Sequence, residues 1–242
     1  RMNFPTMASA HEVTEYSHIE ATNKPLPDLS GMRCVVGIDT AKTSDFESVS
    51  AVFKKDGNIY VINHTWVCTQ SRDLPRVKFK SEFPRLVEMG LLTLIDDVEI
   101  PPTCVTGFIQ QLKEKYGVLM VCIDDFRYAL FADELSKIGF KKEFKNLKMV
   151  RPSDIARIVP VVESYFLNDK FVWGDNPMLR WATNNTKVIP WRAKTTAGSD
   201  LGNQLYAKIE PKSRKTDPFM SLAHAMTAEN MLKETPPVDD NL

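Results

Sequence analysis

The sequence predicts an α/β domain whose central mixed sheet, an antiparallel meander continued by parallel strands, is flanked by helices. Two strand-like apolar runs flank Lys55-Asp56-Gly57, which is a strong signal for a β-hairpin. Further along the chain, helical and strand-like patterns alternate. Residues 118–123 form an uninterrupted apolar run, typical of a parallel strand that is buried on both faces. A meander followed by this alternation indicates a mixed sheet with helices packed on it.

The first half of the chain contains four strand-like runs and one short helix. The expected strands cover residues 34–38, 49–54, 59–67 and 91–95. The first three follow one another through short polar turns, so we expect them to form the antiparallel meander. Apolar residues near 83–89 predict the helix, and Gly90 follows where a glycine commonly ends one.

The second half alternates between the two kinds of pattern. The expected helices cover residues 105–116, 129–138, 155–166, 177–182 and 216–233. The expected strands cover residues 118–123, 143–144, 171–173 and 204–209, the last as an edge strand. Gly117 and Gly139 stand where a C-cap is expected for the first two of these helices.

Length and composition indicate a globular protein with ample core. The 242 residues are 43% hydrophobic and 26% charged. Because 31 basic residues balance 31 acidic ones, binding of nucleic acid has to rest on local patches. The 4 cysteines are widely spaced without a C-x-x-C pair, which predicts reduced, buried thiols in an intracellular protein. No apolar run approaches the roughly 18 residues of a membrane span, so we expect no membrane partner.

The chain is expected to have three parts. Residues 1–31 are polar and contain prolines, which predicts a linker or arm outside the core. Residues 32–234 carry the periodic patterns and form the folded domain. Residues 235–242 are predicted to be a disordered tail. The opening Arg1-Met2 fits either a tag remnant before an initiator or the middle of a longer protein.

Aspartates end two of the expected strands. Asp39 follows the first strand, and Asp124 and Asp125 follow residues 118–123. Each of them alone is readily explained as a turn residue or a helix cap. If the two strands lie side by side and parallel, Asp39 and Asp124 end at the same sheet edge, where their carboxylates would repel unless a cation sits between them. Because adjacent strand residues point to opposite sides, we expect only one of Asp124 and Asp125 to face this site.

Asp217 precedes Pro218 at the expected start of the last helix. This pair is typical of an N-cap and first turn. A helix N-terminus also keeps a carboxylate ionised, as a metal ligand must be. His224 lies seven residues further on, roughly on the same face, although a lone histidine is more often structural. Oxygen ligands without a cluster of His or Cys favour magnesium or manganese over zinc.

Basic residues gather just before Asp217. These are Lys208, Lys212, Arg214 and Lys215. A run of charges is usually a solvated face, but its position next to a candidate ligand makes it a candidate contact for DNA phosphates. Arg192, beside Trp191 in an expected loop, is a further candidate for DNA contact.

Three blocks of sequence, taken in order, resemble the nuclease domain of phage terminase large subunits. They are Gly37-Ile-Asp39 with Asp45-Phe46 downstream, Val121-Cys-Ile-Asp124-Asp125-Phe-Arg127, and Lys212-Ser-Arg-Lys-Thr-Asp217-Pro-Phe-Met-Ser-Leu-Ala-His-Ala-Met226. Each block alone is common, whereas the three in this order are more specific. The resemblance covers roughly residues 1–232.

The resemblance implies an RNase H-like fold and a metal-dependent endonuclease. Asp39, Asp124 and Asp217 would be the catalytic metal ligands and would hold two divalent cations, Mg²⁺ or Mn²⁺. Asp45, Asp125 and His224 would support these ligands. The family often has Asp-Pro after the second strand, where this chain has Asp124-Asp125. The substrate implied is double-stranded viral DNA, which the family cuts when packaging starts and ends.

The resemblance also implies partners and a location. In the full packaging assembly these would be the portal and the small terminase subunit, in the host cell cytoplasm. The family's ATPase half would precede residues 1–31, and the chain contains no G-x-x-x-x-G-K-[ST] loop, so we expect no ATP site here.

Other functions remain open on the residues alone. A resolvase- or transposase-type RNase H-like nuclease would use the same acids. An actin-like ATPase would share Gly37-Ile38-Asp39-Thr40 but requires further Gly-rich phosphate loops. In a non-catalytic docking module of a packaging motor, the acids would serve as helix caps. Binding of ATP, cleavage of four-way junctions and a response to divalent ions separate these readings.

Overall fold

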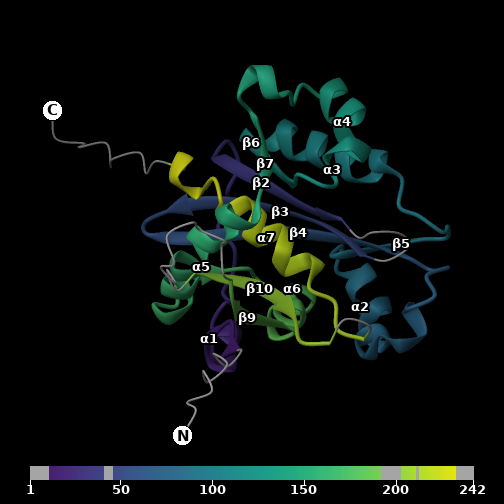
Figure 1. The fold of residues 1–242 in the computed structure, drawn as a ribbon, viewed down its shortest axis with the longest axis vertical. Helices are drawn as coiled ribbons and strands as arrows, with labels where there is room; N and C mark the ends of the chain where they lie inside the picture. The colour runs from purple at the N-terminus through teal and green to yellow at the C-terminus, as the bar shows by residue number, and fades with distance from the viewer. Residues whose placement is uncertain (1–10, 41–45, 192–202, 211–212, 233–242) are drawn as a thin grey trace, which may run out of the picture.

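The computed structural model describes residues 11–40, 46–191, 203–210 and 213–232. Within these ranges, seven strands form a mixed sheet in the order β5-β4-β3-β2-β6-β7, and β8 pairs with β4 (Figure 1). The strands are β2 (Arg33–Thr40), β3 (Phe46–Lys55), β4 (Asn58–Cys68), β5 (Leu92–Ile95), β6 (Gly117–Asp124), β7 (Leu147–Val150) and β8 (Phe171–Val172). The predicted mixed sheet flanked by helices is confirmed.

The first three strands of this sheet form the predicted antiparallel meander. β2 pairs with β3, and β3 pairs with β4, both antiparallel. In the hairpin between β3 and β4, Asp56 and Gly57 both have positive φ, 51° and 72°. This is the backbone conformation that a two-residue hairpin turn requires, and it explains why Asp-Gly stands there.

The middle of the sheet is parallel. β6 lies between β2 and β7 and runs parallel to both. The core residues Val121, Cys122 and Ile123 are fully buried, as the uninterrupted apolar run predicts. In the register of β2 and β6, Ile38 lies opposite Ile123. The last side chains of the two strands therefore lie at the same edge of the sheet, the one formed by the C-terminal ends of β2 and β6.

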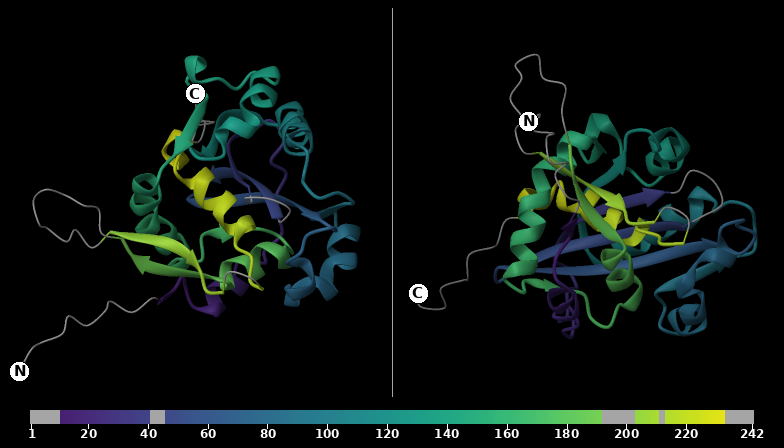
Figure 2. Two further views of the ribbon diagram at one scale, coloured as in Figure 1. Left: turned by 45° about the vertical axis from the view of Figure 1, so that its right-hand side comes forward. Right: turned by 60° about the horizontal axis from the view of Figure 1, so that its bottom comes forward.

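Helices cover both faces of the sheet. α3 (Pro102–Lys115) and α4 (Tyr128–Lys137) share one core with β2, β3 and β6. α5 (Pro152–Leu167), α6 (Pro177–Asn184) and α7 (Asp217–Met226) pack in the core on the other face. α7 lies across the strands (Figures 1 and 2). The remaining helices are α1 (Tyr16–Glu20), α2 (Phe83–Glu88) and the 3-10 helices Leu74–Arg76, Lys78–Glu82, Lys142–Phe144 and Glu229–Met231.

A second, smaller sheet lies beside α5. Its described strands are β1 (His11–Glu12), β9 (Thr186–Pro190) and β10 (Gln204–Lys208), in the order β1-β9-β10 and all antiparallel. The edge strand expected at 204–209 exists, but it belongs to this sheet and not to the central one. Neither β1 nor β9 was expected, because both are short and gain their partners from distant parts of the chain.

Part of the expected arm is packed against the domain. Val13, Ile19 and Leu29 are buried, and Val13 belongs to the same core as α5 and α7. The expectation that the whole of 1–31 lies outside the core is therefore wrong for this described portion. The division of the chain at residues 31 and 234 stays a prediction.

Three local expectations are also wrong. Residues 142–144 form a 3-10 helix, and the strand of this region, β7, begins only at Leu147. Gly117 is not a C-cap: α3 ends at Lys115, Tyr116 is extended with φ −134°, and Gly117 already begins β6. α7 ends at Met226, well before residue 233, because a 3-10 turn follows it.

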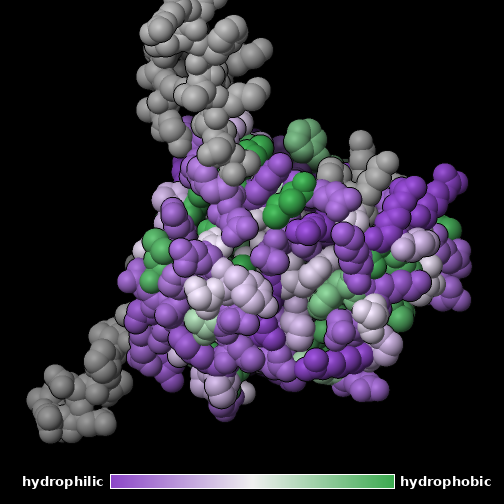
Figure 3. Space-filling model, turned by 90° about the horizontal axis from the view of Figure 1, so that it is seen from below, coloured by the Kyte–Doolittle hydropathy of each residue, from purple (hydrophilic) through white to green (hydrophobic). Residues whose placement is uncertain are grey.

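The cysteines and the surface are the other features for which the composition gives an expectation. The four cysteines are free, and three of them are buried, as predicted. In the part of the chain that the structure describes, no helix is long and apolar enough to cross a membrane. The face shown in Figure 3 is mainly hydrophilic, with hydrophobic side chains in small separate patches.

The close approach of α7 to β2 at Gly37 leads to a stability prediction. A Cβ at Gly37 would lie 2.0 Å from the Ser221 carbonyl oxygen and 2.4 Å from the Ala225 nitrogen. Gly37→Ala must therefore displace the helix backbone, and we expect urea unfolding to show a loss of about 3 kcal/mol or more. Gly107→Ala in α3, where a Cβ meets nothing within 4 Å, is the control and should stabilise by roughly 0.5–1 kcal/mol. Equal effects of the two substitutions would contradict this packing.

Candidate active site

Asp39 and Asp124 lie at the same sheet edge. Asp39 is the next residue after Ile38 on β2, and Asp124 is the next after Ile123 on β6, the two residues that pair in this parallel register. The convergence that their strand positions predict is therefore present. Asp124 is not the N-cap of α4, which is Arg127. Its Oδ1 instead accepts a hydrogen bond from the Phe126 backbone N–H at 2.7 Å, a local turn that holds the carboxylate in place.

Asp217 lies on the first turn of α7, and its charge acts on Asp39. The helix N-cap is Thr216, so the capping role considered for Asp217 does not apply. Its side chain is buried, with 2% of the residue exposed. Among the described residues, its Oδ2 atom has no hydrogen-bond partner, and the Lys208 Nζ atom lies 3.7 Å away. A buried carboxylate oxygen without a hydrogen bond is unfavourable for the fold unless another ligand uses it.

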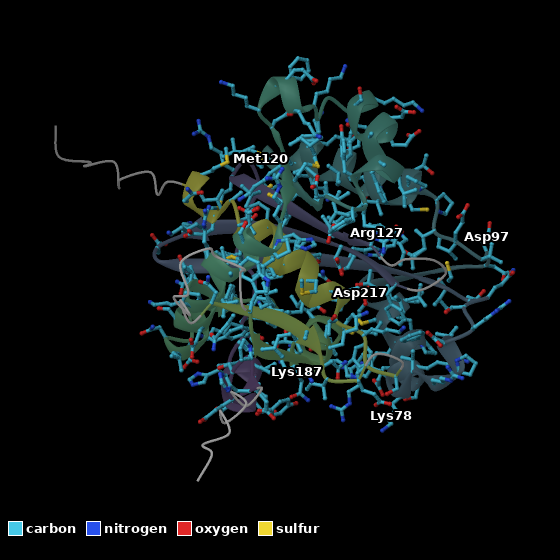
Figure 4. All side chains as sticks on the ribbon, in the orientation of Figure 1. Lys78, Asp97, Met120, Arg127, Lys187 and Asp217 are labelled. Carbon is cyan, nitrogen blue, oxygen red and sulfur yellow. The ribbon has the colours of Figure 1, made fainter. Side chains whose placement is uncertain are left out.

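The electrostatics of Asp39 show that the acids share one environment. Burial raises the pKa of the Asp39 carboxyl well above its usual 3.8, and the negative charges of Asp217 and Asp124 raise it further. Lys208 and Arg127 act in the opposite direction. Figure 4 labels Arg127, which precedes α4, and Asp217, on the first turn of α7. Within the described ranges, however, no three His, Cys, Asp or Glu side chains are already gathered closely enough to hold a metal ion.

His224 is held against the backbone of β2. Its Nδ1 atom is 2.6 Å from the carbonyl oxygen of Ile38. A carbonyl oxygen only accepts, so Nδ1 carries the proton. Burial lowers the pKa of His224, while the bond to Ile38 and the charge of Asp124 raise it. In the neutral ring Nε2 is then an acceptor, and His224 and Asp124 both line one groove.

Of the other residues that the sequence suggested for the site, the structure describes Asp125, Lys215 and Arg214. Asp125 is exposed, and its Oδ2 lies 4.0 Å from the Arg151 Nε atom. Lys215 is 1% exposed, with Nζ 3.9 Å from Asp73 Oδ2, so this placement does not favour contact with DNA. Arg214 is partly exposed. Three candidates lie outside the described residues: Asp45, Arg192 and Lys212.

Two charged residues that the structure places near the acids have no role in the site predicted from the sequence. Arg127 belongs to the second motif, and its charge acts on Asp39. Glu47 is buried on β3, opposite Thr40 in the register, and its Oε2 atom has no hydrogen-bond partner in the described structure. Burial, followed by the charges of Asp217 and Glu99, raises the pKa of Glu47 to about 8. The signal that could have found Glu47 is an acid at the start of an otherwise buried apolar strand.

The buried Glu47 predicts a distinct dependence of stability on pH. Between the ordinary pKa of 4.5 and about 8, the folded protein keeps a proton that the unfolded chain releases. The free energy of unfolding therefore falls as the pH rises through this window. Glu47→Gln removes this loss, so its advantage over the wild type should grow from near zero at about pH 4.5 to the order of 2–4 kcal/mol above pH 8.

Chemical denaturation at several pH values in a chelator measures this difference. The exposed Glu88, changed to Gln, is the control and should show no trend. A constant difference between Glu47→Gln and the wild type across the same range would show that Glu47 titrates normally.

A family model matches most of the chain, and several solved structures have a similar fold. The family model described as "Terminase large subunit, endonuclease domain" matches residues 1–229. No curated protein sequence matches the chain. The fold is similar to the crystal structure of the HK97 bacteriophage large terminase, with a TM-score of 0.73 and 18% identity, over 91% of this chain and 44% of that one. The chain thus spans less than half the length of that terminase.

The large terminase nuclease from the thermophilic phage G20c is also similar. Its structure with bound magnesium gives a TM-score of 0.52 and 14% identity, over 90% of this chain and 97% of that one. Its structure with bound cobalt gives 0.52 and 13%, with the same coverage of both chains. Terminase nuclease domains are RNase H-like, and the expected RNase H-like fold is confirmed.

Proposed function

The chain belongs to the family of terminase large subunit endonuclease domains, and from this premise we propose that it is a divalent-metal-dependent endonuclease. Its substrate is double-stranded viral DNA, cut when genome packaging starts and ends. The observation that supports the proposal is that Asp39 and Asp124 end two neighbouring parallel strands, and that the charges of Asp124 and Asp217 both act on Asp39. The family separates this function from the resolvase, transposase and actin-like alternatives.

We assign the metal ligands to Asp39, Asp124 and Asp217. The donor set fits a hard cation such as Mg²⁺ or Mn²⁺, because it consists of carboxylate oxygens. The buried Asp217 Oδ2 atom, without a hydrogen bond, is a ready ligand atom. Asp124 is preferred over Asp125 because its charge acts on Asp39, whereas Asp125 is exposed. The side chains must turn towards a shared cation when it binds, since they repel each other without one.

The residues around the acids have distinct tasks in this proposal. Two divalent ions, when bound, would supply an activated water and stabilise the leaving oxygen. Lys208, 3.7 Å from Asp217, limits the repulsion within the cluster, and we propose that it and Arg214 also contact DNA phosphates. Lys212 and Arg192 are proposed to act in the same way. The buried Lys215 instead supports the segment before α7, facing Asp73. His224 fixes α7 to β2, and its Nε2 atom is left as a proton acceptor in a ring that lines the same groove as Asp124.

The wider assembly is part of the proposal. The chain spans less than half of the HK97 terminase, and translocation is no part of the function proposed for these residues. The portal and the small terminase subunit would be its partners, in the host cell cytoplasm.

Plasmid digestion tests the metal dependence and the ligand assignment together. Mg²⁺ and Mn²⁺ should both support nicking and linearisation, and excess EDTA should abolish them.

Asp39→Asn and Asp124→Asn should each lower the rate roughly 100-fold or more, because each removes a metal ligand. Their melting temperatures in EDTA should be unchanged or raised, since one repulsive charge is gone. Asp125→Asn is the matched control and should stay close to the wild type. Cleavage that persists in EDTA would falsify the proposal, and an inactive Asp125→Asn beside an active Asp124→Asn would move the ligand to Asp125.

Asp217→Asn separates a metal ligand from a structural acid. The amide keeps the shape of the side chain but is a weaker ligand, so cleavage should be largely lost. Adding Mn²⁺ should raise the melting temperature of the wild type through binding to the folded state, and this shift should shrink in the variant. Asp133→Asn, an exposed acid on α4, is the control and should behave as the wild type in both assays. A folded Asp217→Asn variant with normal cleavage and a normal Mn²⁺ shift would remove Asp217 from the site.

A further inference from the structure

A groove opens directly beside the acid cluster. Its volume is about 480 Å³, within the roughly 300–1,000 Å³ typical of pockets that hold a small ligand. Asp124 and His224 line it on the side of the acids. Its apolar lining comes from β7, α5, β10 and α7, through Val150, Ile155, Leu205 and Met220. No part of the proposed metal chemistry uses this apolar surface.

Phe126 stands on the lining of this groove and is 86% exposed. An aromatic ring this exposed adds little to the stability of the fold, because it buries little apolar surface. Its backbone is nevertheless held in place, since its N–H donates to Asp124 Oδ1 at 2.7 Å. The ring is therefore kept two residues away from a proposed metal ligand.

The charges around the groove favour one part of a nucleotide over another. Asp124 and Asp125 line one side and would repel a bare phosphate. A nucleobase carries no charge and has a flat π-face, which suits an apolar floor and an exposed aromatic ring. Arg151, also in the lining and exposed, supplies a positive charge for the phosphate attached to that base.

We propose that this groove binds an unpaired nucleotide of the DNA strand next to the cleaved bond. The base stacks on Phe126, and its phosphate lies towards Arg151. The assignment of DNA as the ligand rests on the proposed nuclease function, and the groove adds a subsite to it. Because every base has a π-face, this subsite holds the strand without reading its sequence.

Binding of a short fluorescein-labelled oligothymidine, followed by anisotropy in EDTA, tests the subsite without requiring metal or cleavage. Phe126→Ala should weaken binding by about 5-fold or more, the lower end of the effect of losing one base–aromatic stack. Phe144→Ala is the matched control: this phenylalanine is 63% exposed but lies outside the groove lining, and its loss should change affinity less than about twofold. Equal affinity of Phe126→Ala and wild type would overturn the proposal.

Two further variants separate stacking from charge. Phe126→Trp should keep the affinity, and its fluorescence at position 126 should be quenched by the oligonucleotide, measured against the wild type. Arg151→Ala should reduce the slope of log affinity against log salt by about 0.7, the value for one phosphate on a single strand. Phe126→Ala should leave that slope unchanged. A Phe126→Trp variant without added quenching would contradict stacking even if its affinity were normal.

The wild-type plasmid assay keeps the two proposals apart. If the wild type does not cut with Mn²⁺ but binds the oligonucleotide through Phe126, the nuclease proposal fails and the subsite stands. If the wild type cuts and Phe126→Ala binds the oligonucleotide equally well, the subsite fails and the nuclease proposal stands.

Discussion

The close contact between α7 and β2 determines the geometry of the whole site. At Gly37 the helix backbone approaches so near that no side chain fits between the two elements. Buried hydrogen bonds then fix how the helix sits: Ser221 Oγ lies 2.8 Å from Ser50 Oγ, and Asn63 Nδ2 donates to Ser50 Oγ at 2.9 Å. A buried polar layer of this kind tolerates one register only, because any shift would leave its members unpaired. That register also fixes where Asp217, on the first turn of α7, stands when its charge acts on Asp39.

The same contact brings negative charges together in a place that opposes their ionisation. The apolar cores on both faces of the sheet stabilise the fold, while the edge between them carries Asp39, Asp124 and Asp217. The packing of the two cores thus holds these carboxylates near one another, although their charges repel. Such local conflict with the rules of stability is typical of functional sites, where a ligand supplies the missing compensation. Glu47, buried on the neighbouring strand, is a fourth acid whose ionisation is opposed by burial and by the charge of Asp217.

Much of this arrangement could be predicted from local sequence. The Asp-Gly turn, the continuous apolar run before Asp124 and the apolar spacing of α5 each report their own element directly. The sequence places Asp39 and Asp124 at one edge only on the condition that their strands are parallel neighbours, and the pairing of β2 with β6 meets that condition. The small second sheet could not be predicted, because His11–Glu12 pairs with Lys187 and Val188, far along the chain, and its strands are too short to show a period. The burial of Lys215 was equally hidden, since a lysine in a basic run ordinarily faces solvent.

The turn from Asp124 to Arg127 shows how few residues can set several properties of a site. One oxygen of Asp124 accepts the Phe126 N–H, which fixes the orientation of the carboxylate that we propose as a metal ligand. The Arg127 N–H donates to the Asp124 carbonyl oxygen at 3.1 Å and closes the turn, so the guanidinium charge acts on Asp39 from a defined place. Asp124, the Arg127 charge that acts on Asp39 and the exposed aromatic ring are therefore positioned by the same local hydrogen bonds. A substitution that altered this turn would disturb all three at once, whereas one that changed only the ring would leave the charges where they are.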